Sequence, residues 1–262
     1  MRYFDVHAHI FPDKIAAKVV AYLEDYYGMT WSGDGTPGDL LKSMDEAGVE
    51  KALVLSCATK PEQVTAANDY LCRISSICPD RFCALGTLHP DYPDCKGELA
   101  RMRKLGLRGL KLHPDFQKVY IDEPKMMRIY GEIGGDFPIL FHCGDSRTDF
   151  SSPWRLARVL DTFPHLKIIG AHFGGYSEWD EVWKHLVGRN LWFDTSSTLW
   201  RLPQEEACRL AVSHGADKLL FASDYPAVNH RQAVADVVSL GLSEAENEAV
   251  FHGNAEKLFG LN

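Results

Sequence analysis

The sequence has no long hydrophobic run and no excess of positive charge. No stretch approaches the roughly 20 apolar residues that a membrane-spanning helix needs, and residues 1–11 hold no apolar run of signal-peptide length. Its 28 lysines and arginines are outnumbered by 36 aspartates and glutamates, which gives a formal net charge of -8. These absences predict a cytoplasmic protein that binds neither membranes nor nucleic acid, because no broad basic surface is available to neutralise phosphates.

The sequence also lacks the features that divide or cross-link a chain. Its seven cysteines are an odd number without any C-x-x-C pair, which indicates reduced thiols. No Pro-, Ser- or Gly-rich linker is present, and no internal repeat is larger than one strand and one helix. We therefore expect residues 1–262 to form one domain that acts on a small molecule, with homo-oligomer formation left open.

Eight short runs of aliphatic, aromatic and β-branched residues recur along the chain, each followed by a stretch with helical spacing. The predicted strands are residues 3–10, 51–57, 81–88, 107–113, 138–144, 166–172, 191–196 and 218–224. The predicted helices are residues 39–47, 62–77, 94–105, 123–134, 153–162, 178–187, 203–214 and 243–259. Strict alternation predicts an α/β fold in which eight parallel strands close into a (β/α)8 TIM barrel. An open doubly wound sheet is the alternative, but HAHIFPDK stands where its Gly-rich turn would follow the first strand.

The longest irregular segment, residues 27–38, follows the first strand. A loop at this place would overhang the mouth of the barrel. Its Trp31 and the neighbouring Tyr26 and Tyr27 either form a wall of a substrate pocket or pack onto the barrel as ordinary loop aromatics.

The first strand carries polar residues where the interior of a barrel favours aliphatic ones. Because successive side chains of a strand point to opposite faces, Asp5, His7 and His9 are expected inside the barrel, and the apolar residues between them against the helices. Two imidazoles at this spacing can bind one ion, at about 2.0–2.1 Å if it is zinc. Asp5 either orients a ligand or is a buried polar group of the barrel floor.

Further polar residues end later strands. His142 ends the fifth, His172 the sixth and Asp224 the eighth, and these ends share one rim of a parallel barrel. Taken singly, His142 is as well explained as a structural histidine and Asp224 as a helix cap. Jointly, these side chains match a divalent metal site with nitrogen and oxygen ligands and an open position for water.

Other polar residues divide into surface positions and candidate substrate contacts. His165, His185 and His214 fall in predicted helices or turns, so we expect surface or capping roles for them. The candidate substrate-binding residues are Lys111 and His113, which share a face of the fourth strand, and Arg147, which follows FHCGD.

The motifs HAH, GLKLHP, FHCG, AHFGG and FASDYP, in this order, resemble the amidohydrolase superfamily. The likeness extends from residue 3 to 261 and is nearer to the amidohydrolase-related branch, which contains metal-dependent hydrolases and the aminocarboxymuconate-semialdehyde decarboxylase group. The resemblance implies metal ligation by His7, His9, His142 and Asp224, with His172 as a catalytic group beside the ion. We favour one divalent ion, Zn²⁺, over two ions bridged by a carboxylated Lys111.

A metal-dependent hydrolase is the function that we expect from this resemblance. The ion lowers the pKa of its bound water toward about 7, Asp224 takes the proton, and His172 stabilises the oxyanion formed from a lactone, amide or ester.

Three alternatives remain open at this point. A non-oxidative decarboxylase would need a cation for the substrate carboxylate, such as Arg147 or Arg201, and the chain is shorter than is typical of that group. A TatD-like nuclease is disfavoured because Lys111 and ASD stand in place of a Glu and an ETD motif. A catalytically silent binding protein is disfavoured by the intact set of ligands.

Overall fold

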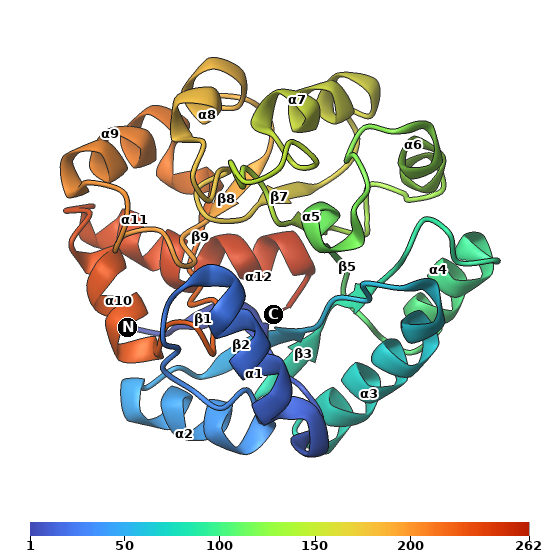
Figure 1. The fold of residues 1–262 in the computed structure, drawn as a ribbon. Coiled ribbons are helices and arrows are strands. Elements are labelled where there is room, and N and C mark those ends of the chain that lie inside the picture. The colour runs from blue at the N-terminus through green and yellow to red at the C-terminus, as the bar shows by residue number, and fades with distance from the viewer. Residues whose placement is uncertain (262) are drawn as a thin grey trace.

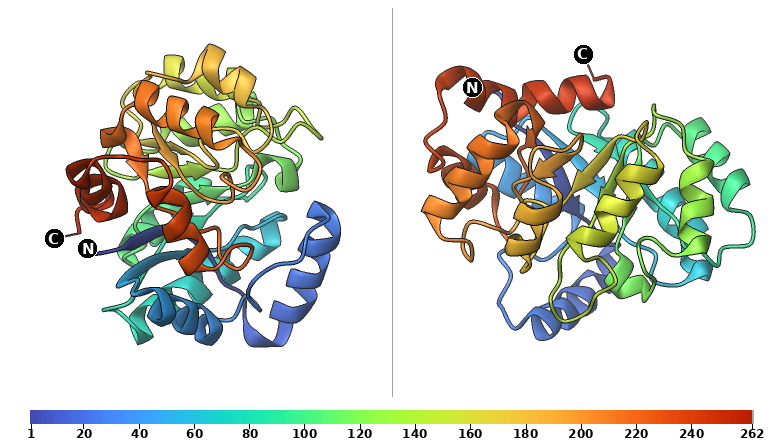
Figure 2. Two further views of the ribbon diagram at one scale, coloured as in Figure 1. Left: turned by 90° about the vertical axis from the view of Figure 1, so that its left-hand side faces the viewer. Right: turned by 90° about the horizontal axis from the view of Figure 1, so that it is seen from above.

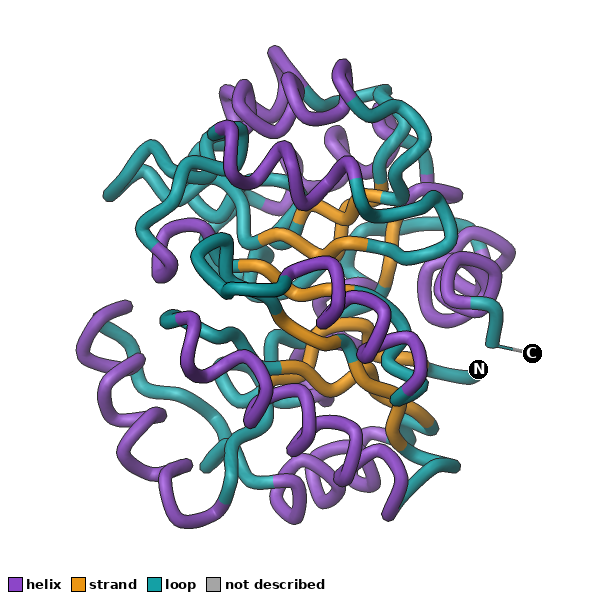
Figure 3. The backbone as a smooth tube through the Cα atoms, turned by 90° about the vertical axis from the view of Figure 1, so that its right-hand side faces the viewer, coloured by secondary structure: helices purple, strands orange, loops and turns teal. Residues whose placement is uncertain are grey.

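Parallel strands occupy the centre of the molecule and helices cover its outside (Figure 1, Figure 3). The computed structural model describes residues 1–261. One ladder runs β1-β2-β3 and a second runs β4-β5-β6-β7-β8-β9, and β3 and β4 are halves of one strand interrupted only at Leu85. The predicted (β/α)8 barrel is therefore confirmed.

The strands are shorter than the predicted runs, but each lies within one of them. They are β1 (Phe4–His9), β2 (Lys51–Leu55), β3 (Phe82–Ala84), β4 (Gly86–Thr87), β5 (Leu110–Leu112), β6 (Ile139–Phe141), β7 (Ile168–Gly170), β8 (Trp192–Asp194) and β9 (Leu219–Leu220).

Helices follow the strands as expected, and four of them were not predicted: α1, α5, η2 and α10. The helices are α1 (Asp13–Tyr27), α2 (Pro37–Ala47), η1 (Pro61–Gln63), α3 (Val64–Ile77), α4 (Cys95–Lys104), α5 (Pro114–Gln117), α6 (Pro124–Gly131), α7 (Pro153–Thr162), α8 (Trp179–His185), α9 (Gln204–His214), η2 (Ala216–Lys218), α10 (His230–Val238), α11 (Glu244–Glu248), the π-helical η3 (Ala249–Gly253) and α12 (Asn254–Phe259). None of the helices described is both long enough and apolar enough to cross a membrane.

The barrel closes between its first and last strands. The backbone N–H of Val6 donates to the carbonyl of Phe221 at 3.0 Å, and that of His9 donates to Tyr225 at 2.7 Å. The N–H of Asp224 donates back to the carbonyl of His7 at 2.9 Å. His7 and Asp224 are thus held side by side by this closure, which we call the seam.

Alternation along β1 does not run as predicted, because the register with β2 shifts between Asp5 and Ala8. Phe4 and Val6 pack in an inner apolar cluster with residues from several other strands and from α12. Asp5 instead contacts α10, where its carboxylate accepts a hydrogen bond from His230. The expectation that Asp5 faces the barrel interior and Phe4 and Val6 face the helices is wrong, since a β-bulge changes which face each side chain takes.

The two ends of the barrel are covered differently (Figure 2). Helix α12 and both chain termini lie at one end, and α12 contributes Ala255, Leu258 and Phe259 to the inner cluster. Helix α1 lies at the opposite end, where the strands have their carboxyl termini. In TIM barrels this carboxyl end carries the functional groups.

Candidate metal centre

Three side chains from the seam converge at the carboxyl end of the barrel. The Nε2 atoms of His7 and His9 are 3.1 Å apart, and each lies 3.4 Å from Oδ1 of Asp224. Two ligands bound at about 2.1 Å are separated by roughly 3.0 Å at a right angle and by roughly 3.4 Å at the tetrahedral angle. The three atoms, which we call the donor triangle, therefore have the spacing that one divalent ion requires.

His7 is oriented by a carboxylate behind it. Its Nδ1 lies 2.8 Å from Oδ2 of Asp194, so the Nδ1 hydrogen donates to Asp194 and the lone pair of Nε2 faces the triangle. Oδ1 of Asp194 accepts hydrogen bonds from the backbone N–H groups of His172 and Ser196. A carboxylate behind a metal-binding histidine commonly fixes its tautomer and ring orientation.

His172 and His142 form a second imidazole pair beside the triangle. Nδ1 of His172 lies 2.9 Å from the carbonyl of Ser196 and donates to it, so Nε2 of His172 accepts from Nδ1 of His142 at 3.0 Å. The backbone of His172 is left-handed, with φ of 60°. Nε2 of His142 is buried and has no hydrogen-bond partner. The donor atoms of His7, His9 and Asp224 all lie within 4.8 Å of one another, and no nitrogen of His142 lies that close to all three. The ring of His142 must therefore move to reach an ion held by the triangle.

Burial determines the charge of these groups. It lowers the pKa values of His7, His9, His113 and His142, which keeps the imidazoles neutral and able to bind an ion. Burial opposes the charge of Asp224, but His7 and His9 hold the pKa of its carboxyl below the usual value. The donor set is thus two neutral nitrogens and one carboxylate oxygen.

Of the three residues predicted to bind substrate, only His113 lines the cavity at the donor triangle. Lys111 lies beneath the cavity, fully buried, with Nζ 2.9 Å from Nε2 of His7, and burial lowers its pKa to about 8. Arg147 binds Asp145 and donates to the carbonyl of Tyr26 at 2.7 Å, and it does not line the cavity.

A second histidine and aspartate group, His113, Asp115 and His142, has its donor atoms within 4.8 Å of one another. The rings of His113 and His142 are stacked, with centroids 3.9 Å apart and planes 8° from parallel. Ring lone pairs lie in the ring plane, so stacked imidazoles cannot both point at one ion. Asp115 already accepts hydrogen bonds from Ser151 and Thr148. This group is suited to packing rather than to metal binding.

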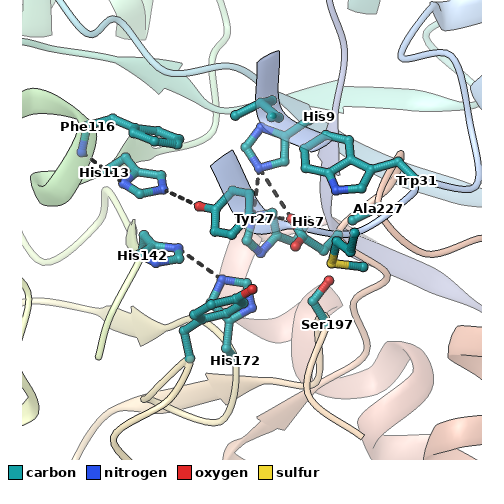
Figure 4. Close-up of a pocket in the computed structure, with 14 residues that line it drawn as sticks. His7, His9, Tyr27, Trp31, His113, Phe116, His142, His172, Ser197 and Ala227 are labelled. Carbon is teal, nitrogen blue, oxygen red and sulfur yellow. Dashed lines mark hydrogen bonds and ion pairs between the residues drawn. The ribbon is translucent and has the colours of Figure 1, made fainter. Parts of the chain in front are cut away.

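Aromatic side chains enclose the donor triangle (Figure 4). The cavity has a volume of about 40 Å³ and is lined by His7, His9, Leu23, Tyr27, Met29, Trp31, His113, Phe116, His142, His172, Tyr176, Ser197, Asp224 and Ala227. Tyr27 and Trp31 thus line the pocket, whereas Tyr26 lies outside it. A volume of this size holds water but not an aromatic acid. A neighbouring cavity of about 610 Å³ between α1 and α3 shares His9, Leu23, His113 and Phe116 with it.

Asp194 and Ser197 were not singled out from the sequence. Asp194 ends β8 in WFDTSS, so the rule that identified His142 and Asp224 also applied to it. Ser197 follows in the loop, and no sequence pattern marks it.

The sequence matches the amidohydrolase family over residues 4–261, so the chain belongs to that family. A gamma-resorcylate decarboxylase of Polaromonas sp. (strain JS666 / ATCC BAA-500) is 24% identical over 288 aligned positions, which cover 85% of this chain and 86% of the relative. A 2,6-dihydroxybenzoate decarboxylase, solved with 2,6-dihydroxybenzoate, has a TM-score of 0.74 at 22% identity and 100% coverage of both chains. A dihydroxybenzoic acid decarboxylase of Polaromonas sp. JS666, solved with manganese and 2-nitroresorcinol, has a TM-score of 0.73 at 20% identity, with 99% and 97% coverage.

These comparisons correct the expected reaction. The prediction of a hydrolase that attacks a lactone, amide or ester is wrong, because the curated relatives are decarboxylases. The argument that the chain is too short for that group also fails, since the alignments cover 86% of each relative.

Proposed function

We propose that this protein is a metal-dependent, non-oxidative decarboxylase of small aromatic carboxylic acids. The observation that supports this most is the donor triangle with His172 beside it, in a chain whose curated relatives are decarboxylases. The 40 Å³ cavity would have to widen toward the neighbouring 610 Å³ cavity to admit an aromatic acid. Its aromatic walls would then suit the ring; they are Tyr27, Trp31, Phe116 and Tyr176.

His7, His9 and Asp224 would hold the ion, and His142 would join them after its ring turns. The unpartnered, buried Nε2 of His142 and the spacing of the triangle are the features that fit such a group. A divalent ion bound there supplies positive charge to the oxygens of a carboxylate substrate. The donor set accommodates Zn²⁺ or Mn²⁺, and the manganese in a structural neighbour makes Mn²⁺ the first ion to test.

The residues of the chain would position the substrate and move a proton. In the reaction the bond between the ring and the carboxylate breaks, its electron pair stays on the ring carbon, carbon dioxide leaves, and the carbon takes a proton. His172 is the residue placed to deliver that proton once the ring of His142 turns toward the ion, because the turn would free Nε2 of His172 to carry a proton while the Ser196 carbonyl still holds Nδ1. The aromatic wall excludes water while charge develops on the ring.

Of the two arginines considered for the substrate carboxylate, Arg201 has the better position. Its guanidinium lies 4.9 Å from the ring centroid of Tyr176, which lines the cavity. Arg147 is neutralised by Asp145 at 2.5 Å and stacks on Tyr26.

The test measures products from metal-loaded protein. Mass spectrometry should detect carbon dioxide from 2,6-dihydroxybenzoate or a related hydroxybenzoate, and no hydrolysis of lactones, amides or esters. His172→Asn should reduce release by about 10²-fold or more, whereas His185→Asn, on the α8 surface, should leave it unchanged. Release of no carbon dioxide across a panel of aromatic acids would contradict the proposal.

Metal content is tested separately. Purified protein reconstituted with Mn²⁺ or Zn²⁺ should bind one equivalent, and His7→Ala combined with Asp224→Asn should bind none. Unchanged metal content in the double variant would reject the donor triangle as the metal site.

A further inference from the structure

Unpartnered polar atoms are concentrated around the catalytic cavity. Within residues 1–261, six buried side-chain nitrogen or oxygen atoms lack a hydrogen-bond partner. Three of them, Trp31 Nε1, His142 Nε2 and Ser197 Oγ, belong to residues that line the 40 Å³ cavity. Buried polar groups are nearly always paired, so unpaired ones at a cavity point to a missing ligand. His142 is explained by the proposed metal, but Trp31 and Ser197 are not.

Trp31 is held in place by its backbone and its loop. The backbone N–H of Trp31 donates to Oε1 of Glu24 at 2.8 Å, and the backbone N–H of Ser32 donates to the carbonyl of Pro226 at 2.9 Å. The loop is thereby fixed both to α1 and to the segment after β9. A donor on a fixed ring is preorganised, because little conformational freedom is lost when a ligand binds.

Ser197 adopts a backbone conformation that is unusual for its residue type. Its φ of 41° lies in the left-handed region, which non-glycine residues enter mainly at functional sites. The preceding carbonyl of Ser196 accepts hydrogen bonds from His172 and from Thr198 Oγ1, which hold the loop in this form. Figure 4 shows Ser197 and Trp31 on one side of the pocket and His113 and His142 on the other.

We infer that Trp31 and Ser197 bind an oxygen-bearing ring substituent of the substrate, on the side of the pocket away from His142, and so determine specificity. Indole Nε1 can only donate, so its partner must be an acceptor such as a hydroxyl oxygen. A serine hydroxyl donates or accepts, so one substrate hydroxyl can pair with both residues. The substrate is then an aromatic acid with a ring hydroxyl. This inference rests on the proposed function for the aromatic acid class.

The test compares binding of benzoate, the parent acid without a hydroxyl, with 2-, 3- and 4-hydroxybenzoate and 2,6-dihydroxybenzoate, by titration calorimetry on metal-loaded protein. At least one derivative should bind the wild type about tenfold or more tightly than the parent, because a site built for a hydroxyl discriminates against its absence. Trp31→Phe and Ser197→Ala should each remove most of this gain while leaving the affinity for the parent within about threefold.

Two controls separate a hydrogen bond from a change in structure. Ser197→Gly suits the left-handed backbone and removes the hydroxyl, so it should reproduce the loss seen with Ser197→Ala. Trp154→Phe, on α7, should keep the wild-type gain. A gain that survives in Trp31→Phe, Ser197→Ala and Ser197→Gly, or no gain for any derivative, overturns the inference.

Carbon dioxide is measured in the same samples. A gain that depends on Trp31 and Ser197 without carbon dioxide release supports this inference and rejects the decarboxylase. Carbon dioxide release by the wild type, together with a gain in affinity that persists in the Trp31 and Ser197 variants, supports the decarboxylase and rejects this inference. Failure of the wild type to bind any of the five acids overturns both.

Discussion

Two clusters of histidine and aspartate lie near β1, and they differ in how completely they are paired. The open cluster is His7, His9, His142, His172 and Asp224 at the cavity. The closed cluster is Asp5, Ser43, Ser223 and His230, between the barrel and helices α2 and α10.

In the closed cluster the carboxylate of Asp5 is fully used. It accepts from the backbone N–H groups of His7 and Ser223, from Oγ of Ser223, and from Nε2 of His230 at 3.0 Å. Nδ1 of His230 lies 2.8 Å from Oγ of Ser43. The open cluster instead leaves His142 Nε2 unpaired and presents His9 and Asp224 to a cavity. Similar residue types therefore serve stability where they pair with one another and chemistry where they do not.

The largest effect should come from the open cluster. His172→Asn should reduce carbon dioxide release by about 10²–10⁴-fold, because it removes the group that we propose protonates the ring carbon. The melting temperature should change little, which calorimetry would show. Equal activity in the variant, or a melting temperature lowered in proportion to the lost activity, would erase the distinction between the clusters.

The closed cluster should respond in the opposite way. Asp5→Ala leaves several buried donors unpaired, so the free energy of unfolding should fall by about 3–5 kcal/mol. Denaturant titration measures this, and Asp136→Ala, at an exposed position, should stay within about 0.5 kcal/mol of the wild type. A small loss for Asp5→Ala would mean that pairing contributes little here.

His214 is a single buried histidine that resembles the closed cluster, because both of its ring nitrogens have hydrogen-bond partners. Its Nε2 donates to the carbonyl of Leu191 and its Nδ1 accepts from the N–H of Gly188, while burial lowers its pKa to about 4. The unfolded chain binds this proton near pH 6.5 and the folded protein does so only near pH 4. The free energy of unfolding should therefore fall by up to about 3 kcal/mol as the pH drops through this window, and level off below it.

The His214→Gln variant isolates that contribution. Denaturation at several pH values should show a shallower decline between pH 6.5 and 4 than in the wild type, because the carboxylates common to both cancel. Parallel curves for the two proteins would show that His214 is not held neutral by its surroundings.

The smallest effect should come from Asp194, whose carboxylate orients His7 of the donor triangle. Asp194→Asn keeps the size of the side chain but weakens its hold on His7, so metal affinity should fall by about 10–100-fold. Competition with a metal chelator measures this. An unchanged affinity would show that the triangle is oriented without Asp194.

The sequence predicts the barrel well because the alternation of strands and helices can be recognised from residues that are neighbours in the sequence. Each of the eight apolar runs contains a strand, and β6, β7 and β9 precede His142, His172 and Asp224 as expected. The side-chain faces of β1 could not be predicted, because the bulge between Asp5 and Ala8 arises from pairing with β2 rather than from residues within the strand.

Details of the site depend on contacts that are distant in the sequence. The stacking of His142 on His113 and the hydrogen bond from His7 to Asp194 join residues of different strands. Helix α1 was missed; it buries only Ala16 and Val20 and leaves the apolar residues Ile15 and Tyr22 exposed, so its sequence does not separate cleanly into an apolar and a polar face. The reaction was mispredicted because hydrolysis and decarboxylation use the same residue types around an ion.

The seam has a consequence for folding. His7 and His9 come from the first strand and Asp224 from the segment after the last one, so they meet only when the barrel has closed. Any ligand that these three residues hold therefore binds the folded chain and not the unfolded one. By mass action it raises the free energy of unfolding by RT ln(1 + [L]/Kd), about 2.7 kcal/mol at a hundredfold excess over Kd. The ligand would link the first strand to the segment after the last one, so the free energy of unfolding would rise with the ligand concentration.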